Sequence, residues 1–179
     1  MNYYSTKKHT GFTLIEMIIA VFIFTVSLTA LMAISSRGLR TAKEAQNQVV
    51  ADYLALEGIE IVRNLRDSAL LSLEDVSTWQ NVFDQDGCLS QGGGDPSCMF
   101  TLDDPIVLEP CSTCTVYYSE SAHAYRHDQP PGYGYKDSGF TRKIKFTTAT
   151  GNDSEIVVKV VVTWNGGEVE YTDNLFLWL

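Results

Sequence analysis

Four cysteines are the residues whose spacing most directly suggests chemistry: Cys88, Cys98, Cys111 and Cys114. Four cysteines allow three pairings, and proximity along the chain favours Cys88–Cys98 and Cys111–Cys114. A zinc site is the alternative, because Cys111 and Cys114 have the spacing of a zinc knuckle, although Cys88 and Cys98 do not. A redox role for the second pair lacks the strand-to-helix setting that is typical of such motifs. Since the acidic part of the chain is predicted below to be exported, we expect disulfides.

Asp84, Asp86 and Gly87 resemble a fragment of a calcium-binding loop. The loop pattern then fails, because no Glu stands at the twelfth position counted from Asp84. Asp95, Asp103 and Asp104 could supply oxygen ligands from elsewhere, so Asp84 and Asp86 are kept as calcium candidates. The simpler expectation is a solvated acidic turn without a cofactor.

His123 and His127, with Asp128, suggest a metal ligand set or a general base. The neighbouring prolines indicate a loop, so the spacing places these side chains on no common face, and we expect them at the surface. The sequence contains neither a Gly-x-Ser-x-Gly motif nor a phosphate-binding glycine loop. We find no catalytic constellation and expect a protein that is not an enzyme.

Five tyrosines lie in and around the same loop: Tyr117, Tyr118, Tyr125, Tyr133 and Tyr135. We expect them to cover an edge of a sheet, with an interface as the alternative. Stacking on single-stranded DNA would need nearby cations, and only Arg126 and Lys136 are close in sequence. DNA binding is therefore not indicated.

Charged residues are distributed very unevenly along the chain. The 179-residue chain has a net charge of −9, which argues against a general nucleic-acid binder. The first eleven residues carry Lys7 and Lys8 and no acid, whereas residues 67–125 carry ten carboxylates and no Lys or Arg. An apolar run, residues 12–34, separates the two regions. This order predicts an anchored protein whose acidic body faces away from the cytoplasm.

The apolar run has 23 residues, which corresponds to a helix of about 34 Å and suffices to span a bilayer. No cleavage site of the usual secretory type follows it. Glu16 is its only charged residue. A carboxylate there either serves a function or reaches the headgroups, and the residues of the run alone leave both options open.

The segment Lys7-Lys8-His9-Thr10-Gly11-Phe12-Thr13-Leu14-Ile15-Glu16 decides between them. It resembles the type IV prepilin signal that pilins share with type II secretion pseudopilins: a short basic leader, Gly, then Phe-Thr-Leu-Ile-Glu and an apolar run. The close match covers only about the first 35 residues. The resemblance implies that a membrane-embedded prepilin peptidase cuts between Gly11 and Phe12 and methylates the new Phe12 amine. It also implies that the apolar helix stays on the protein.

The resemblance further implies that Glu16 docks the subunit onto a filament by meeting the Phe12 amine of a neighbour, since a buried charge is tolerable mainly when it is paired. A pair within the same chain is the alternative, and the helix dipole would also favour an anion there. The implied partners are prepilin peptidase, other pilin or pseudopilin subunits, the assembly platform and the cytoplasmic membrane. Many relatives have a proline in this helix; here no Pro or Gly lies between Phe12 and Ser36, so we expect an unkinked helix whose weak point is at residues 35–38.

A helical apolar stripe predicts that the helix continues well beyond the membrane. The stripe consists of Val50, Leu54, Ile61 and Leu65, flanked by Tyr53 and Val62. We expect it to face a sheet, with Gly58 allowing close packing. The opposite face, with Lys43, Asp52, Glu60 and Arg63, is expected to be solvated.

The end of the chain has the alternation of β-strands. One strand is expected around Ile144 and Phe146, the next along residues 156–164 and a last one from Val169 toward the C-terminus, with a turn at residues 165–167. Residues 115–118 could add a further strand, and residues 119–139 are expected to form a loop. The predicted fold is α+β, a pilin-like roll in which a long N-terminal helix packs against a three- to four-stranded antiparallel sheet.

The expected organisation is a removed leader (1–11), a transmembrane or filament-core helix (12–35), its continuation (36–71) and an extracytoplasmic head (72–179). The first functional hypothesis is a structural subunit of a type IV pilus or pseudopilus, and the size of the head favours a minor pilin. The subunit would stand in the cytoplasmic membrane before assembly and in an extracellular or periplasmic filament afterwards. The alternative is a pilus-borne binding module for adhesion or DNA uptake, and the third hypothesis is a signal-anchored extracytoplasmic enzyme.

Overall fold

The computed structural model describes residues 11–72, 81–84, 87–90, 96–102, 106–148 and 155–176. The chain forms two compact units, one ending at Glu44 and the other beginning at Ala45. The basic leader before Gly11 and the calcium candidate Asp86 lie outside the described residues. The same holds for the additional carboxylates Asp95, Asp103 and Asp104.

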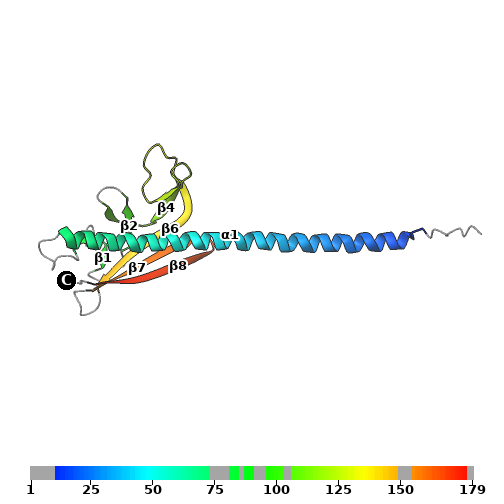
Figure 1. Cartoon of the computed structure of the whole chain (residues 1–179), viewed down its shortest axis with the longest axis horizontal. Helices are drawn as coiled ribbons and strands as arrows, with labels where there is room; N and C mark the ends of the chain where they lie inside the picture. Colours follow the sequence, from blue (N-terminus) through cyan, green and yellow to red (C-terminus); the bar gives the residue numbers. More distant parts are fainter. Residues whose placement is uncertain are drawn as a thin grey trace, which may run out of the picture. The chain divides into compact units, whose positions relative to one another are not determined.

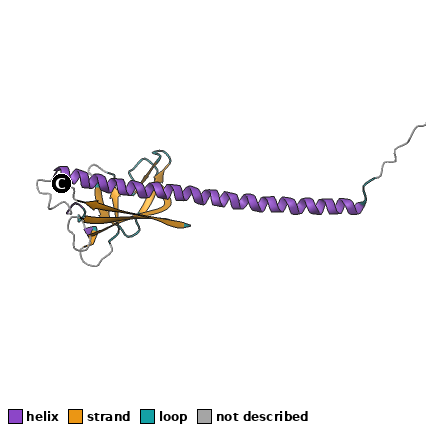
Figure 2. Cartoon of the chain, turned by 60° about the horizontal axis from the view of Figure 1, so that its bottom comes forward, coloured by secondary structure: helices purple, strands orange, loops and turns teal. Residues whose placement is uncertain are grey.

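One helix, α1, runs from Leu14 to Ser72 over 59 residues (Figures 1 and 2). Its sequence contains no proline, and the helix is continuous through residues 35–38, where the sequence suggested a weak point. Gly38 interrupts neither the helix nor any packing, because a Cβ at this position would meet nothing within 4 Å. The first part of α1 belongs to the first unit, and the part from Ala45 is the helical layer of the second unit, here called the head.

The described residues of the head form an eight-stranded sheet. Its strands are β1 (Leu89–Ser90), β2 (Cys98–Thr101), β3 (Val107–Pro110), β4 (Thr115–Ser119), β5 (Ala124–Arg126), β6 (Lys136–Thr148), β7 (Glu155–Trp164) and β8 (Gly167–Phe176). The α+β class and the long helix against an antiparallel sheet are confirmed. The described sheet has more strands than the three or four expected, because short segments that look like loop in sequence pair with the long strand β6 or, as β3 and β5 do, with a strand beside it.

The strand β6 is the centre of the sheet. Its residues 140–148 pair antiparallel with β7, which continues through a two-residue turn into β8. The opposite edge of β6 pairs in succession with β4, β2 and β1, of which β1 alone is parallel to it. The expected loop 119–139 is therefore shorter than predicted, since it contains β5 and since β6 begins at Lys136.

The core lies between the sheet and the second half of α1, which lie side by side in Figure 2. Alternate residues of β7 are fully buried, namely Ile156, Val158, Val160 and Val162. On α1 the most deeply buried residues are Ala51, Leu54, Ala55, Ile59 and Val62. The predicted stripe is thus confirmed in its direction, although Tyr53 is 70% exposed.

Gly58 brings α1 close to the sheet. A Cβ at this position would stand 3.1 Å from Cγ1 of Val160 and 3.6 Å from Cδ of Arg142. Contacts near 3.1 Å are tighter than ordinary van der Waals packing, so a larger residue would push the helix and β7 apart. Ala51 and Ala55 lie one turn apart on the same face, and their small, buried side chains also allow the helix to pack close to the sheet.

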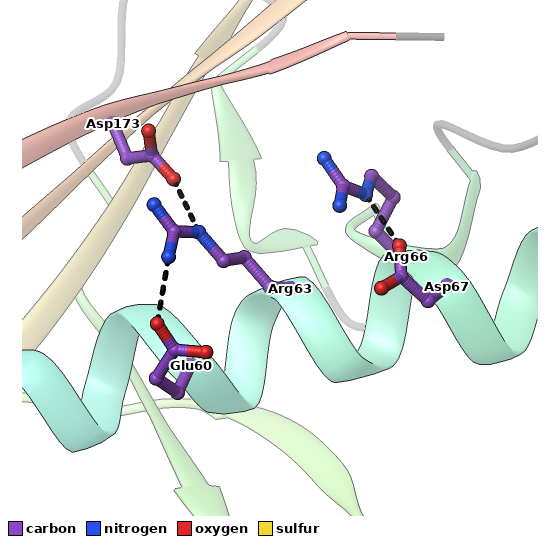
Figure 3. Close-up of polar contacts among 5 residues, drawn as sticks. All are labelled: Glu60, Arg63, Arg66, Asp67 and Asp173. Atoms are coloured by element: carbon purple, nitrogen blue, oxygen red, sulfur yellow. Dashed lines mark hydrogen bonds and ion pairs between the residues drawn. The ribbon is translucent and has the colours of Figure 1, made fainter. Parts of the chain in front are cut away.

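Polar contacts join the side of α1 to the edge strand β8. Arg63 donates from Nε to Asp173 at 2.9 Å and from Nη1 to Glu60 at 2.6 Å (Figure 3). Tyr171 donates its hydroxyl hydrogen to Asp52 at 3.3 Å. The expectation of a solvated face is wrong for Asp52 and Arg63, which are half-buried because β8 extends the sheet to this side of the helix; Lys43 and Glu60 are exposed.

Candidate functional site

Gly11 and Phe12 precede the first residue of α1, so the peptide bond between them lies outside the helix. The Phe12 side chain is 78% exposed. A Cβ added at Gly11 would meet nothing within 4 Å, so the described residues leave space around this peptide bond. An exposed, non-helical bond next to a residue without a side chain is accessible to a protease.

Glu16 lies in the first turn of α1. The carbonyl of Thr13 accepts hydrogen bonds from the backbone N–H groups of Glu16, at 3.1 Å, and of Met17, at 3.3 Å. A carboxylate at this end of a helix is favoured by the helix dipole. The Glu16 side chain makes no hydrogen bond or ion pair with any residue that the structure describes, so it remains available to a partner outside the described chain.

The hydroxyl groups of the apolar part of α1 are satisfied within the helix. Thr25, Ser27 and Thr29 donate to the carbonyls of Phe22, Ile23 and Val26, each at 2.8 Å. Ser36 donates in the same way to Ala33. Because an unpaired polar group in hydrocarbon is costly, this internal pairing suits a helix in lipid or among other apolar helices. Glu16 is then the one ionisable side chain of residues 12–34.

Large apolar side chains project all around this part of the helix. Those more than half exposed include Leu14, Ile15, Met17, Ile18, Val21, Phe22, Phe24, Leu31 and Ile34. A helix that is apolar on every side requires an apolar environment. By length and composition α1 can cross a membrane, and it is the one described helix that can do so.

Both disulfides join cysteines that are near in sequence. Cys88 is bonded to Cys98, and Cys111 is bonded to Cys114. Cys88, Cys98 and Cys114 are buried in the head, and no described cysteine is free. This is the pairing that proximity favours, and it removes these thiolates as zinc ligands.

Asp84 lies in a tight turn, where its backbone carbonyl accepts a hydrogen bond from the N–H of Gly87 at 3.1 Å. Gly87 has a φ of +82°, which a residue without Cβ adopts at little cost. Among the described residues, no three His, Cys, Asp or Glu side chains are grouped so that they could hold a metal ion. Asp86 lies outside the described residues, so the calcium option stays a prediction.

Arg142 is a residue that the sequence reasoning missed. It lies on β6, its side chain is fully buried, and it reaches across to α1. Its Nη1 donates to the carbonyl of Leu54 at 3.1 Å and to the carboxylate of Glu57 at 2.5 Å. Its guanidinium carbon stands 4.0 Å from the centre of the Phe100 ring. Burial lowers the pKa of Arg142 from its ordinary value, and the ion pair with Glu57 opposes this shift.

His127 is buried beside Arg142, so the expectation that it lies at the surface is wrong. Its Nδ1 lies 3.0 Å from the carbonyl of Thr115, and its Nε2 accepts a hydrogen bond from Nε of Arg142 at 3.2 Å. Only a neutral ring with its hydrogen on Nδ1 can make both bonds. Burial, followed by the charge of Arg142, lowers the pKa of His127 to about 4.

One signal in the sequence pointed to Arg142. Residues 140, 144 and 146 are Phe, Ile and Phe, and they alternate with polar residues. Because side chains two apart in a strand share a face, Arg142 had to lie on the buried face with them. For His127 the sequence offers no comparable signal, since it follows a strand of only three residues.

The family model described as "Prokaryotic N-terminal methylation motif" matches residues 6–32. The match covers the predicted cleavage position, Glu16 and most of the apolar run. No curated protein and no solved structure matches the chain.

Proposed function

We propose, from the premise that this chain belongs with the type IV prepilins and pseudopilins whose methylation motif it carries, that it is a minor pilin with a structural role. The motif implies processing by prepilin peptidase and assembly with other pilins. It also fits membrane anchoring through the apolar helix before a filament forms. In this proposal the peptidase cuts between Gly11 and Phe12, and the processed subunit enters the filament through α1.

The observation that carries the proposal is that Glu16 has no partner among the described residues. It is the one charge of an apolar helix whose hydroxyl groups are already satisfied, and no described residue pairs with it. Cleavage creates a cationic amine at Phe12, and an amine of this kind on a neighbouring subunit would neutralise Glu16. A charge buried without a partner costs several kcal/mol, so pairing would select one axial register between subunits.

Cleavage also changes the charge of the chain. Removing Lys7 and Lys8 from a chain of net charge −9 leaves −11 on side chains. The two lysines hold the leader on the cytoplasmic side, and their loss lets the helix leave the bilayer. The carboxylate that remains in the helix is the same one that the assembly step uses.

Two substitutions separate processing from assembly in cells that produce filaments. Gly11→Val places a branched side chain at the scissile bond, and we expect full-length precursor to accumulate. Glu16→Ala leaves the bond intact, and we expect processed chain in the membrane and a loss of chain from sheared filaments. Glu44→Ala removes an exposed carboxylate from the same helix and serves as the matched control. Normal entry of the Glu16→Ala chain into filaments would show that the docking role is wrong.

A further inference from the structure

A cavity of about 620 Å³ opens on the head beside the β4–β5 hairpin and the start of β6. The loop that joins β5 to β6 forms its other side, and Figure 1 shows that loop projecting next to β4. The residues that matter to its chemistry are Tyr118, Glu120, Tyr125, Tyr133, Lys136 and Asp137. Its volume falls within the range of about 300–1,000 Å³ that is usual for small-ligand sites.

Hydrogen bonds hold the two sides of this cavity together. The hydroxyls of Ser119 and Ser121 both donate to the carbonyl of Tyr133, at 2.5 and 2.9 Å. Ser119 is fully buried and also accepts a hydrogen bond from the N–H of Ala122 at 3.1 Å. The loop that carries Tyr133 is therefore fastened to the hairpin, and a ligand would not have to order it.

An irregularity of the sheet lies next to the residues that line the cavity. The register of β4 against β6 shifts between Val116 and Tyr117, and the hydroxyl of Ser138 donates to the Val116 carbonyl. The carboxylate of Asp137 accepts a hydrogen bond from the N–H of Gly139 at 2.8 Å. Such bulges redirect the side chains around them and are common next to binding sites.

The aromatic wall rests on the core. The ring centroids of Tyr118 and Tyr125 lie 4.7 Å apart, and the rings of Tyr125 and Phe140 form a T-shaped pair with centroids 6.4 Å apart. Phe140 in turn packs against Trp164 at 6.3 Å. Tyr133, on the loop, is 52% exposed. The cavity thus combines a wall that is fixed by packing with an exposed ring that a ligand can cover.

The charged groups of the cavity are mixed in sign. Glu120 and Asp137 are acidic and Lys136 is basic, and neither Glu120 nor Lys136 forms an ion pair with a residue that the structure describes. A phosphate or other anion would face two carboxylates beside one ammonium. The two carboxylates accept hydrogen bonds, the ammonium donates them, and the hydroxyl groups can do both. This mixture suits a neutral ligand with many hydroxyl groups.

We propose that the cavity binds a neutral saccharide. A sugar ring has an apolar face of C–H groups, which matches the electron-rich face of a tyrosine ring, and a rim of hydroxyls, which matches Glu120, Asp137 and Lys136. The proposal goes beyond the structural role proposed above and does not depend on it, because the cavity lies wholly within the head.

The test uses the full chain in nanodiscs of phosphatidylethanolamine and phosphatidylglycerol, which carry no sugar or choline headgroup. The probes are an array of neutral mono- and disaccharides, with choline chloride as the cationic comparison, and binding is measured by saturation-transfer NMR. We expect at least one neutral saccharide to bind with an affinity that does not change with salt. Tyr133→Ala should weaken that affinity about threefold to tenfold, and Tyr133→Phe, which keeps the ring, should retain it.

Tyr53→Ala is the matched control, because Tyr53 is a still more exposed tyrosine that does not line this cavity. Equal weakening by Tyr53→Ala and Tyr133→Ala would overturn the proposal, since the binding would then be non-specific. Binding of choline alone, binding that falls steeply with salt, or no binding of any neutral saccharide would each overturn it as well. Measurements on unassembled chain keep this result separate from the fate of Glu16 variants in filaments.

Discussion

The buried ring of His127 makes the stability of the head depend on pH in a defined way. The ring is neutral in the folded head, where it donates to the Thr115 carbonyl and accepts from Arg142. In the unfolded chain it takes up a proton near its ordinary pKa of 6.5, whereas in the folded head its pKa is lowered to about 4. Between these values the unfolded state binds more protons, so the free energy of unfolding decreases as pH falls from about 7 to about 4.

The magnitude follows from the size of the pKa shift. The pKa of His127 moves from 6.5 to about 4, and each unit corresponds to about 1.4 kcal/mol, so this residue accounts for a loss of about 3 kcal/mol. Burial is the larger cause and the positive charge of Arg142 the second. Asp128, on the same loop, opposes the shift. Glu57 lies on the other side of Arg142 and pairs with it.

The assay compares the full chain in nanodiscs with its His127→Gln variant by urea unfolding, followed by near-ultraviolet circular dichroism. A glutamine can accept from Arg142 and donate to the Thr115 carbonyl, yet it does not titrate. Carboxylates that do not interact with His127 contribute equally to both proteins, so the difference between their two pH profiles reports on His127 together with its neighbour Asp128. We expect the native chain to lose about 3 kcal/mol more than the variant between about pH 7 and about pH 4.

The exposed His123, which lies in the β4–β5 turn with a φ of +49°, supplies the control. Its His123→Asn variant keeps a residue that tolerates this conformation and should show the native pH profile. Parallel profiles for the native chain and His127→Gln would refute the reasoning, because His127 would then titrate alike in both states. An NMR titration of the His127 ring with a midpoint near its ordinary value would refute it independently.

Three further substitutions test the packing of the head by the same unfolding assay. Gly58→Val should lower the free energy of unfolding by about 1–3 kcal/mol, because its side chain meets Val160. Val160→Ala in the same chain should recover part of that loss. If the double variant instead loses the sum of the two single losses, the contact is contradicted. Arg142→Ala should lower the free energy of unfolding by about 2–5 kcal/mol, because it empties buried space and leaves the Leu54 carbonyl and Nε2 of His127 without their donor; a loss below about 1 kcal/mol would contradict these contacts. Replacing both Cys88 and Cys98 by Ser should lower the free energy of unfolding by about 3 kcal/mol, as expected when a disulfide that closes a loop with a sequence separation of 10 is removed. An unchanged urea midpoint would contradict a stabilising role of this disulfide.

Periodic patterns explain why much of this fold could be predicted from sequence. The alternation in residues 156–164 and the turn at Asn165-Gly166 predict β7 and β8, and the stripe through Leu54 predicts the buried face of α1. These signals are local, because neighbouring residues alone produce them. The short strands β1, β2 and β3 could not be predicted in this way, since they have two to four residues and depend on pairing with one another or with β6 far along the chain.

The same contrast between local patterns and contacts of distant residues applies to the candidate site. Gly11, Phe12 and Glu16 were predicted because the signal that contains them is contiguous, and the family model covers the same stretch. The buried contacts of Arg142 with Glu57 and His127 join residues up to 85 positions apart, so no local pattern reveals them. The cavity beside the β4–β5 hairpin likewise depends on the hydrogen bonds that hold the loop of Tyr133 against the hairpin, which the clustering of tyrosines alone does not predict.

The central place of β6 has a consequence for how the head comes into being. A chain is made from its N-terminus, and β1, β2 and β4 all precede the strand with which they pair. Until residues 136–148 have emerged, β2 and β4 can form only the local hairpins with β3 and β5, and β1 lacks the strand with which it pairs. The apolar face of the second half of α1 stays uncovered for longer still, because it packs against Val160 of β7, which follows β6. Folding of the head is therefore tied to the completion of the chain, and a truncated product ending before β6 would hold the helix without the sheet that covers it.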